Sequence, residues 1–213
     1  MESLEILFAE FNGKFKPDID NIKHYFPEAK VSVYTESECN PLFEQESQFY
    51  GYYMNDYWKV EKLLSSEAEI AISLDADMKI VSEDVRVLLT LTKKFGLCLP
   101  ANPRKLVKID TDTGSHSDGK LDETKGLGYA FNMSPIAFNT KDTRARRILE
   151  EYCQIMIANP VRGPLAMWRA VYKLGYFPCL LPPQWCVCAE DVGVGNEIIL
   201  HLGHTKVRDY YNC

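Results

Sequence analysis

The sequence predicts a single α/β domain over residues 1–213, with a mixed, mostly parallel central sheet flanked by helices. Apolar runs typical of buried strands alternate with helix-like segments in the first half, and one of these strands ends on two aspartates. A chain of 213 residues with 46% hydrophobic content is long enough to bury one substantial core. We therefore expect one domain with a Rossmann-like half at about residues 1–100 and a more mixed half at about 101–213.

The first half is expected to alternate strand, helix, strand, helix, strand. The strands are predicted at Leu4 to Phe11, at Val31 to Thr35 and over 68–77, and the helices between them at Asp18 to Phe26 and Ser47 to Leu64. The second of these helices carries aromatic and aliphatic residues at helical spacing. This order predicts parallel strands with right-handed connections, whose carboxyl ends meet at one edge of the sheet.

The second half is expected to be more mixed. A helix is predicted at Ser82 to Lys94 and a strand at Gly96 to Pro100. The further elements are strand segments at 128–133 and 136–139, helices at 143–158 and 164–174, an extended proline-rich segment at 178–187 and a strand at 197–202. The polar segment at 108–128 breaks the pattern, and a loop of this length inside a domain is usually functional or disordered. It is long enough to close over a substrate.

Composition excludes several classes of protein. A net charge of −6 disfavours sequence-independent nucleic-acid binding, which needs a basic surface. No apolar run approaches the roughly 18 residues of a membrane span, and the segment Met1 to Glu5 is too acidic to begin a signal peptide. The seven cysteines are scattered and odd in number, so we expect reduced thiols. Cys186-Val187-Cys188 lacks the spacing of the usual zinc sites. These features predict a soluble, cytoplasmic monomer with a small-molecule partner.

The aspartate pair is the most informative feature of the chain. Asp75 and Asp77 end the apolar run that begins at Ala68, and strand alternation would point both to the same side. Two carboxylates placed in this way can bind one divalent cation. The alternative is that they cap the helix that Ser82-Glu83-Asp84 begins. We favour the metal site, because a cap needs neither the second aspartate nor the long apolar approach.

The tail of the chain adds a histidine to this pattern, and the combination is similar to that of a known family. An aspartate pair at the end of a buried strand, followed late in the chain by a histidine in a Gly-His turn with basic residues beyond it, resembles the GT-A class of nucleotide-sugar glycosyltransferases. The resemblance implies that Asp75 and Asp77 hold Mn²⁺ or Mg²⁺ against the donor diphosphate. It implies His204 as a further metal ligand, with His201 as the competing candidate, and Lys206 and Arg208 near the phosphates. It also implies that residues at about 1–100 form a nucleotide-binding half and those at about 101–213 an acceptor half with the metal-site tail. Such a cation stabilises the charge that develops on the leaving nucleoside diphosphate.

The resemblance extends to a narrower group. The segments Phe8 to Phe11 and Leu74 to Asp77 are similar to those of glycosyltransferase domains from chloroviruses, which are large algal viruses, that decorate the capsid glycan. This implies a UDP-sugar donor, retention of anomeric configuration and a glycan acceptor, with a capsid glycoprotein as the possible carrier. It also implies a site of action in the host cytoplasm and a longer natural polypeptide.

Residues at the expected sheet edge are candidates for binding the donor. They are Ala9, Glu10, Phe11 and Asn12 after the first strand, Tyr34 and Thr35 at the end of the second, and Asp75 and Ala76 at the end of the third. Tyr34 is a candidate for stacking on uracil, although an aromatic residue in this position is as often half-buried in the sheet. Lys59 lies on the preceding helix, where a lysine usually belongs to a solvated face.

The acceptor side is expected to lie in the second half. Asn132, Met133 and Trp185 are candidates for sugar contacts, with a core role as the alternative for the tryptophan. Glu190 and Asp191 are the best-placed acids for acceptor activation. An inverting enzyme needs a base there, whereas in a retaining enzyme the leaving phosphate can take the acceptor proton. The arginines at 144, 146, 147 and 162 are expected on solvated faces.

Two other functions are compatible with parts of the pattern. A phosphohydrolase of the haloacid dehalogenase type also ends a buried strand on Asp-x-Asp, but that family has the pair on its first strand, followed by Gly-Thr or a similar pair. Here Met78-Lys79 follows the aspartates, and the pair belongs to the third predicted strand. The other function is a module that binds sugar or nucleotide without turnover.

Overall fold

A mixed sheet forms the centre of the molecule in the computed structural model, which describes residues 3–10, 15–38, 50–102, 130–158 and 160–213. Its strands lie in the order β2 (Lys30–Thr35), β1 (Leu4–Glu10), β3 (Ile70–Asp75), β7 (Ile136–Asn139), β5 (Leu97–Asn102) and β6 (Ala130–Phe131), and β8 (Cys179–Leu181) pairs with β5. β1 is parallel to β2 and β3, and β8 is parallel to β5. β7 is antiparallel to β3 and β5, and β6 is antiparallel to β5. The predicted fold class is confirmed.

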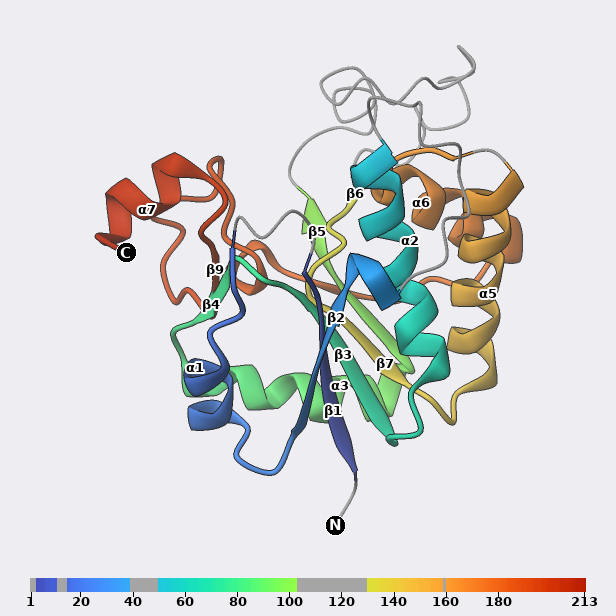
Figure 1. Ribbon diagram of the computed structural model, residues 1–213, viewed down its shortest axis with the longest axis horizontal. Coiled ribbons are helices and arrows are strands. Elements are labelled where there is room, and N and C mark those ends of the chain that lie inside the picture. Colours follow the sequence, from blue (N-terminus) through green and yellow to red (C-terminus); the bar gives the residue numbers. More distant parts are fainter. Residues whose placement is uncertain (1–2, 11–14, 39–49, 103–129, 159) are drawn as a thin grey trace.

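Helices cover both faces of the sheet (Figure 1). On one face, α2 (Tyr50–Ser65), α5 (Thr143–Ala158) and α6 (Gly163–Leu174) pack on one another and share a buried cluster that includes Trp58, Tyr152 and Trp168. On the other face, α1 (Ile19–Tyr25) and α3 (Val87–Phe95) enclose a second cluster around Phe8 and Phe26. The strands that separate these clusters are buried on both sides, which explains why they read as continuous apolar runs in the sequence.

A small second sheet brings the end of the chain to the main sheet. β4 (Met78–Ile80) pairs antiparallel with β9 (Ile199–His201), and α7 (Thr205–Tyr211) follows. Met78 is the direct partner of His201. Because β4 begins immediately after the aspartate pair, this pairing holds the C-terminal tail beside it. The sequence did not predict α7 as a helix.

The predicted elements are largely found, with local differences. The helix expected at Ser82 to Lys94 is a short 3₁₀-helix at Glu83–Arg86 followed by α3, and two further 3₁₀ turns lie at Glu36–Glu38 and Pro183–Trp185. Ser82 Oγ accepts from the Asp84 backbone N–H at 3.2 Å. The cap of this segment is therefore Ser82, and the alternative capping role for the aspartate pair is wrong. The predicted loop at 108–128 lies outside the described residues.

The strand order creates a crevice at one edge of the sheet. From β1 the chain passes to β2 on one side and then to β3 on the other, so the carboxyl ends of β1 and β3 flank a topological switch point. Ala9 is in register with both Tyr34 and Asp75 there. Ligands of open α/β sheets bind at such points.

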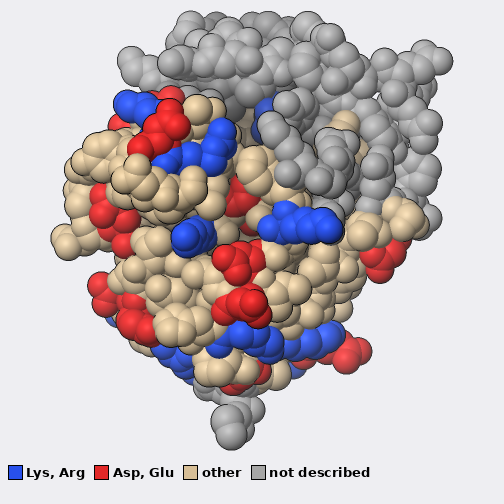
Figure 2. Space-filling view, turned by 60° about the vertical axis from the view of Figure 1, so that its left-hand side comes forward, with Lys and Arg blue, Asp and Glu red and all other residues tan. Residues whose placement is uncertain are grey.

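One face of the described surface carries charges of both signs. Figure 2 shows basic and acidic side chains close together over one face of the molecule. None of the helices within the described ranges is both long and apolar enough to cross a membrane.

Candidate metal centre

The two aspartates converge through a turn. β3 ends at Asp75, and Ala76 and Asp77 form the turn that leads into β4. We had expected strand alternation to bring the two carboxylates together. Instead, the tight turn after β3 does so. The Asp75 backbone N–H donates to Ser134 Oγ at 2.9 Å, which fixes the end of the strand from the neighbouring β7 side. Both carboxylates are only partly exposed, at 21% and 16%.

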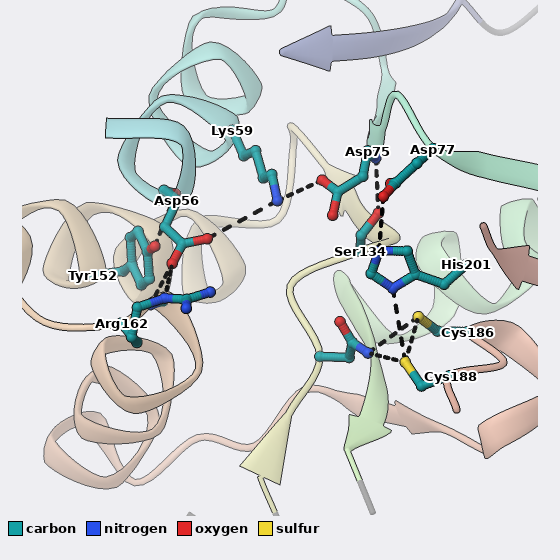
Figure 3. Close-up of polar contacts among 12 residues, drawn as sticks. Asp56, Lys59, Asp75, Asp77, Ser134, Tyr152, Arg162, Cys186, Cys188 and His201 are labelled. Atoms are coloured by element: carbon teal, nitrogen blue, oxygen red, sulfur yellow. Dashed lines mark hydrogen bonds and ion pairs between the residues drawn. The ribbon is translucent and has the colours of Figure 1, made fainter. Parts of the chain in front are cut away.

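His201 completes a three-residue cluster. The Leu202 backbone N–H donates to the Asp77 carbonyl at 2.8 Å, which extends the β4–β9 pairing by one bond. The His201 Nε2 atom then lies 3.2 Å from Asp77 Oδ2 (Figure 3). One ligand atom from each of Asp75, Asp77 and His201 lies within 4.8 Å of the other two. Two carboxylates and an imidazole form a donor set that suits Mn²⁺ or Mg²⁺.

Gly203 leaves the space that this cluster needs. A Cβ atom on Gly203 would overlap Asp77 Oδ2 and would lie 3.2 Å from His201 Nε2. The Gly-His turn of the sequence is therefore a steric requirement of the cluster, because any side chain at position 203 displaces the Asp77 carboxylate.

Lys59 enters the site from α2. Its side chain is only 4% exposed, and its Nζ lies 2.5 Å from Asp75 Oδ1 and 4.0 Å from Asp56 Oδ1. Burial lowers the pKa of Lys59, but the charges of Asp75 and Asp56 raise it further, so the ammonium form is favoured. The expected solvated position of Lys59 is wrong, because this face of α2 packs on the edge of the sheet.

Asp56 anchors a buried polar network that the sequence did not reveal. Asp56 Oδ2 accepts from Arg162 Nε at 3.1 Å and from the Gly163 backbone N–H at 2.8 Å. The Tyr152 hydroxyl donates to the Asp56 carbonyl at 2.8 Å. Arg162 was expected on a solvated face and instead pairs with a buried carboxylate. The network joins α2 to α5 and α6, and so holds Lys59 beside Asp75 (Figure 3).

Asp77 and His201 each shift the pKa of the other toward its charged form. Burial raises the pKa of Asp77, but the His201 imidazole and the Lys59 ammonium lower it further, so the carboxylate form prevails. Burial lowers the pKa of His201, whereas Asp77 and Cys188 raise it, giving a value of about 10. In the absence of a cation, His201 therefore carries a positive charge between Asp77 and Cys188. A metal ion at Nε2 would replace that proton.

A cavity of about 130 Å³ opens beside the carboxylates. It is lined by Ala9, Phe15, Asn55, Asp75, Ala76 and Asp77. Among the predicted donor-binding residues, Ala9 and Ala76 lie here together with Asp75, and their small side chains leave the space open. Asn55 Oδ1 is buried and has no hydrogen-bond donor among the described residues.

The other predicted donor-binding residues lie elsewhere or are not described. Tyr34 lines a separate cavity of about 450 Å³, and the Lys62 ammonium lies 4.8 Å from the centre of its ring. The Thr35 backbone N–H and hydroxyl both donate to Glu38 Oε2, at 2.8 and 2.9 Å. Phe11, Asn12 and the side chain of Glu10 lie outside the described residues. The donor-binding roles of these residues stay predictions.

The tail residues divide between the cluster and the surface. His204 precedes α7, and its ring lies edge-on to the His201 ring with centroids 4.8 Å apart. His201, the competing candidate, is thus the histidine brought together with both aspartates. Lys206 is exposed on α7. Arg208, the second cation expected near the phosphates, donates to the Leu202 carbonyl and to Thr205 Oγ1, which fixes the turn before α7.

The predicted acceptor residues have local roles in the described structure. Asp191 is buried and accepts from the Cys188 backbone N–H at 3.3 Å, and burial raises its pKa. Glu190 is exposed. Met133 and Trp185 belong to the buried clusters. The catalytic roles of Asp191 and Glu190 stay predictions.

Comparison with known proteins supports the fold assignment. No family model and no curated protein matches the sequence. Solved structures do match: a glycosyltransferase involved in glycosylation of the major capsid of the virus PBCV-1 has a TM-score of 0.58 at 12% identity, over 99% of this chain and 98% of that chain. The galactosyltransferase LgtC, crystallised with donor and acceptor sugar analogues, has a TM-score of 0.57 at 12% identity, over 92% and 86%.

A third solved structure agrees with these two. Mouse xyloside xylosyltransferase 1 has a TM-score of 0.51 at 13% identity, over 94% of this chain and 97% of that chain. All three are glycosyltransferases that match the chain over most of its length, and identities this low establish the fold rather than the reaction. The chain has the GT-A glycosyltransferase fold.

Proposed function

We propose that this protein is a metal-dependent glycosyltransferase that moves a hexosyl or deoxyhexosyl group from a UDP-sugar to a glycan acceptor with retention of configuration. One observation carries the proposal: the ligand atoms of Asp75, Asp77 and His201 converge within 4.8 Å beside the switch point of a GT-A fold. The fold alone would allow other functions. A hard-donor cluster at the ligand-binding edge of that fold favours chemistry on a diphosphate.

The cluster fits a divalent cation. Carboxylate oxygens suit Mn²⁺ and Mg²⁺, and imidazole nitrogen is compatible with Mn²⁺, so Asp75, Asp77 and His201 would hold the ion. When bound, the cation supplies positive charge that stabilises the departing diphosphate. Lys59 Nζ lies 2.5 Å from Asp75 Oδ1 and contributes a second positive charge beside the cluster.

The cavity beside the cluster fits the diphosphate end of the donor. At about 130 Å³ it is smaller than a typical pocket for a whole ligand, so it would hold only part of a nucleotide sugar. Ala9 and Ala76 permit close approach, and Asn55 Oδ1 can accept a hydrogen bond from a sugar or ribose hydroxyl. Residues at about 1–100 would bind the nucleotide and those at about 101–213 the acceptor.

Retention is proposed because it needs no separate base. In a retaining transfer the departing phosphate oxygen can accept the acceptor proton, whereas an inverting transfer requires a carboxylate facing the acceptor. Asp191 is a buried acid in the tail, but its carboxylate accepts from the Cys188 N–H. A glycan acceptor on a viral capsid glycoprotein is proposed by analogy with the activity named for the PBCV-1 enzyme.

Calorimetric titration of UDP with and without Mn²⁺ tests the proposal, followed by titration of UDP-sugars. We expect UDP binding that requires Mn²⁺ and that is lost in Asp77→Asn and His201→Ala. His24→Ala is the matched control, because that histidine is exposed on α1 and its Nε2 lies 3.8 Å from Glu83 Oε1 rather than beside an aspartate of the cluster. Metal-independent UDP binding, or unchanged binding in Asp77→Asn, would contradict the proposed site. Absence of UDP binding in both conditions would favour the phosphohydrolase alternative.

A further inference from the structure

A pair of thiols lies on the opposite side of His201 from the carboxylates. Cys186 Sγ and Cys188 Sγ are 3.9 Å apart, and Cys188 Sγ is 3.7 Å from His201 Nδ1 (Figure 3). One ligand atom of each of the three residues lies within 4.8 Å of the other two. Both cysteines are buried, at 1% and 2% exposure. The glycosyltransferase proposed above makes no use of them.

Backbone pairing forces the two thiols to the same side. The Val187 backbone N–H donates to the Ile199 carbonyl at 2.9 Å, and the His201 N–H donates to the Val187 carbonyl at 3.1 Å. Val187 is thus held like a strand residue against β9, and its side chain packs in a separate cluster with Leu200 and Val207. Alternation along an extended segment then points both flanking cysteines toward His201.

Two of the three donor separations match those of a tetrahedral soft-metal site. With Zn–S bonds of about 2.3 Å and Zn–N bonds of about 2.0–2.1 Å, tetrahedral angles separate two thiolates by about 3.8 Å and a thiolate from an imidazole nitrogen by about 3.5 Å. The observed separations are 3.9 and 3.7 Å. A disulfide would need the sulfurs at about 2.05 Å, far closer than they lie. The third separation, between Cys186 and His201, is within 4.8 Å, so the three donors surround a position that one cation can occupy.

Neighbouring groups also suit metal-bound thiolates. Asn132 Nδ2 lies 3.1 Å from Cys186 Sγ and 3.4 Å from Cys188 Sγ, so its amide can donate to both sulfurs. Donors directed at sulfur stabilise the thiolate over the thiol. The His204 imidazole interacts with Cys188 and lies edge-on to His201, so His204 is the candidate for a fourth ligand.

We propose that Cys186, Cys188 and His201 Nδ1 form a second metal site that takes a soft or borderline cation of the zinc class, and that this site competes with the carboxylate cluster for His201. Binding there releases the remaining thiol protons and the Nδ1 proton of the imidazolium to solvent. The other imidazole proton stays on Nε2, which lies 3.2 Å from Asp77 Oδ2 and donates to it. Binding of a hard cation at Nε2 instead requires the imidazole proton on Nδ1, facing Cys188. Since a neutral imidazole carries one N–H, the two cations exclude each other.

Cobalt(II) is a direct probe of the thiolate site. Titration of the full chain, with its thiols reduced, should produce a thiolate-to-cobalt charge-transfer band that saturates at one ion per chain and is abolished by Zn²⁺. We expect Cys186→Ser and Cys188→Ser each to abolish or strongly weaken the band, with circular dichroism to verify folding. Cys213→Ser is the matched control, because this cysteine is exposed and its Sγ contacts Lys79 Nζ and the Tyr211 carbonyl, and it should leave the band intact. Asp75→Asn should also leave it intact.

Two measurements on the unmodified protein avoid any dependence on variant folding. X-ray absorption of the Zn²⁺-bound chain should show two sulfur ligands at about 2.3 Å. Electron paramagnetic resonance should show that Zn²⁺ releases bound Mn²⁺ from the chain. A zinc shell with only oxygen and nitrogen ligands, or a cobalt band that persists in the Cys186→Ser and Cys188→Ser double variant, would overturn the thiolate site. Simultaneous retention of both metals would overturn the competition. If Mn²⁺ fails to bind while the cobalt band appears, the proposed glycosyltransferase site fails and the thiolate site stands.

Discussion

Replacing Gly203 with alanine should remove metal binding while leaving the fold nearly unchanged. The added Cβ would overlap Asp77 Oδ2, which is the end of a side chain and can rotate away. The carboxylate would then leave both His201 and the cation. The backbone at Gly203 is not in the left-handed region, so alanine itself causes no strain there.

The magnitude follows from the groups that move. Gly→Ala restricts the unfolded chain and stabilises by about 0.4–1 kcal/mol. Loss of the 3.2 Å contact between Asp77 and His201 costs about 1–3 kcal/mol, as for hydrogen bonds to charged groups. The net loss in free energy of unfolding should therefore be about 0–2.5 kcal/mol. Removing a residue that only orients a metal ligand typically weakens metal affinity about 10–100-fold. Displacement of Asp77, a direct ligand, should weaken Mn²⁺ binding at least that much.

Gly175→Ala is the control, because it should lower stability and leave metal binding unchanged. Gly175 ends α6 with a φ of +63°, and a Cβ there meets nothing within 4 Å. Alanine in this conformation should lower the free energy of unfolding by about 1 kcal/mol without affecting Mn²⁺ affinity. Calorimetric Mn²⁺ titration and urea denaturation measure the two quantities for both variants. Wild-type Mn²⁺ affinity in a folded Gly203→Ala protein would refute the assignment of Asp77 as a ligand.

Two further predictions concern buried charges. Lys59→Met removes the ammonium that lies 2.5 Å from Asp75, so the free energy of unfolding of the metal-free protein should fall by about 3–5 kcal/mol. Saturating Mn²⁺ should then raise the free energy of unfolding more in the variant than in the wild type, as measured by urea denaturation. Equal increases in the two proteins would argue against Lys59 and the cation acting on the same carboxylate. Glu5→Gln removes a carboxylate whose pKa burial raises but Lys30, Ser66 and Ser32 lower further, for a net decrease. A lowered pKa contributes stability above the unfolded value of about 4.5, which is lost as pH falls through the folded value. The variant should be less stable than the wild type by about 1–3 kcal/mol near neutral pH, with the difference shrinking in acid; a difference independent of pH would contradict this account.

Much of the fold was predictable because its signals are local. Thr143–Ala158 forms the helix that its pattern indicated, with the same bounds. The strands β1, β2 and β3 were predicted from apolar runs, and their parallel order followed from the helices between them. The wrong predictions concern contacts between segments that are distant in the sequence. Nothing in the sequence near Lys59 shows that this face of α2 meets the edge of the sheet, or that Asp56 pairs with Arg162 at the start of α6.

Some residues of the candidate site were predictable from the sequence, whereas others depend on tertiary contacts. The sequence by itself determined the aspartate pair, because an apolar strand that ends on Asp75 and Asp77 is visible in adjacent residues. It could narrow the late histidine only to His201 or His204. The tertiary structure decided which of them meets the aspartates, because antiparallel pairing of β4 with β9 sets Met78 opposite His201 and fixes the register of the tail. It also decided that Cys186 and Cys188 lie behind the same imidazole, since that proximity arises from backbone hydrogen bonds between Val187 and β9. Contacts between segments distant in the sequence depend on strand register, which no short stretch of residues specifies.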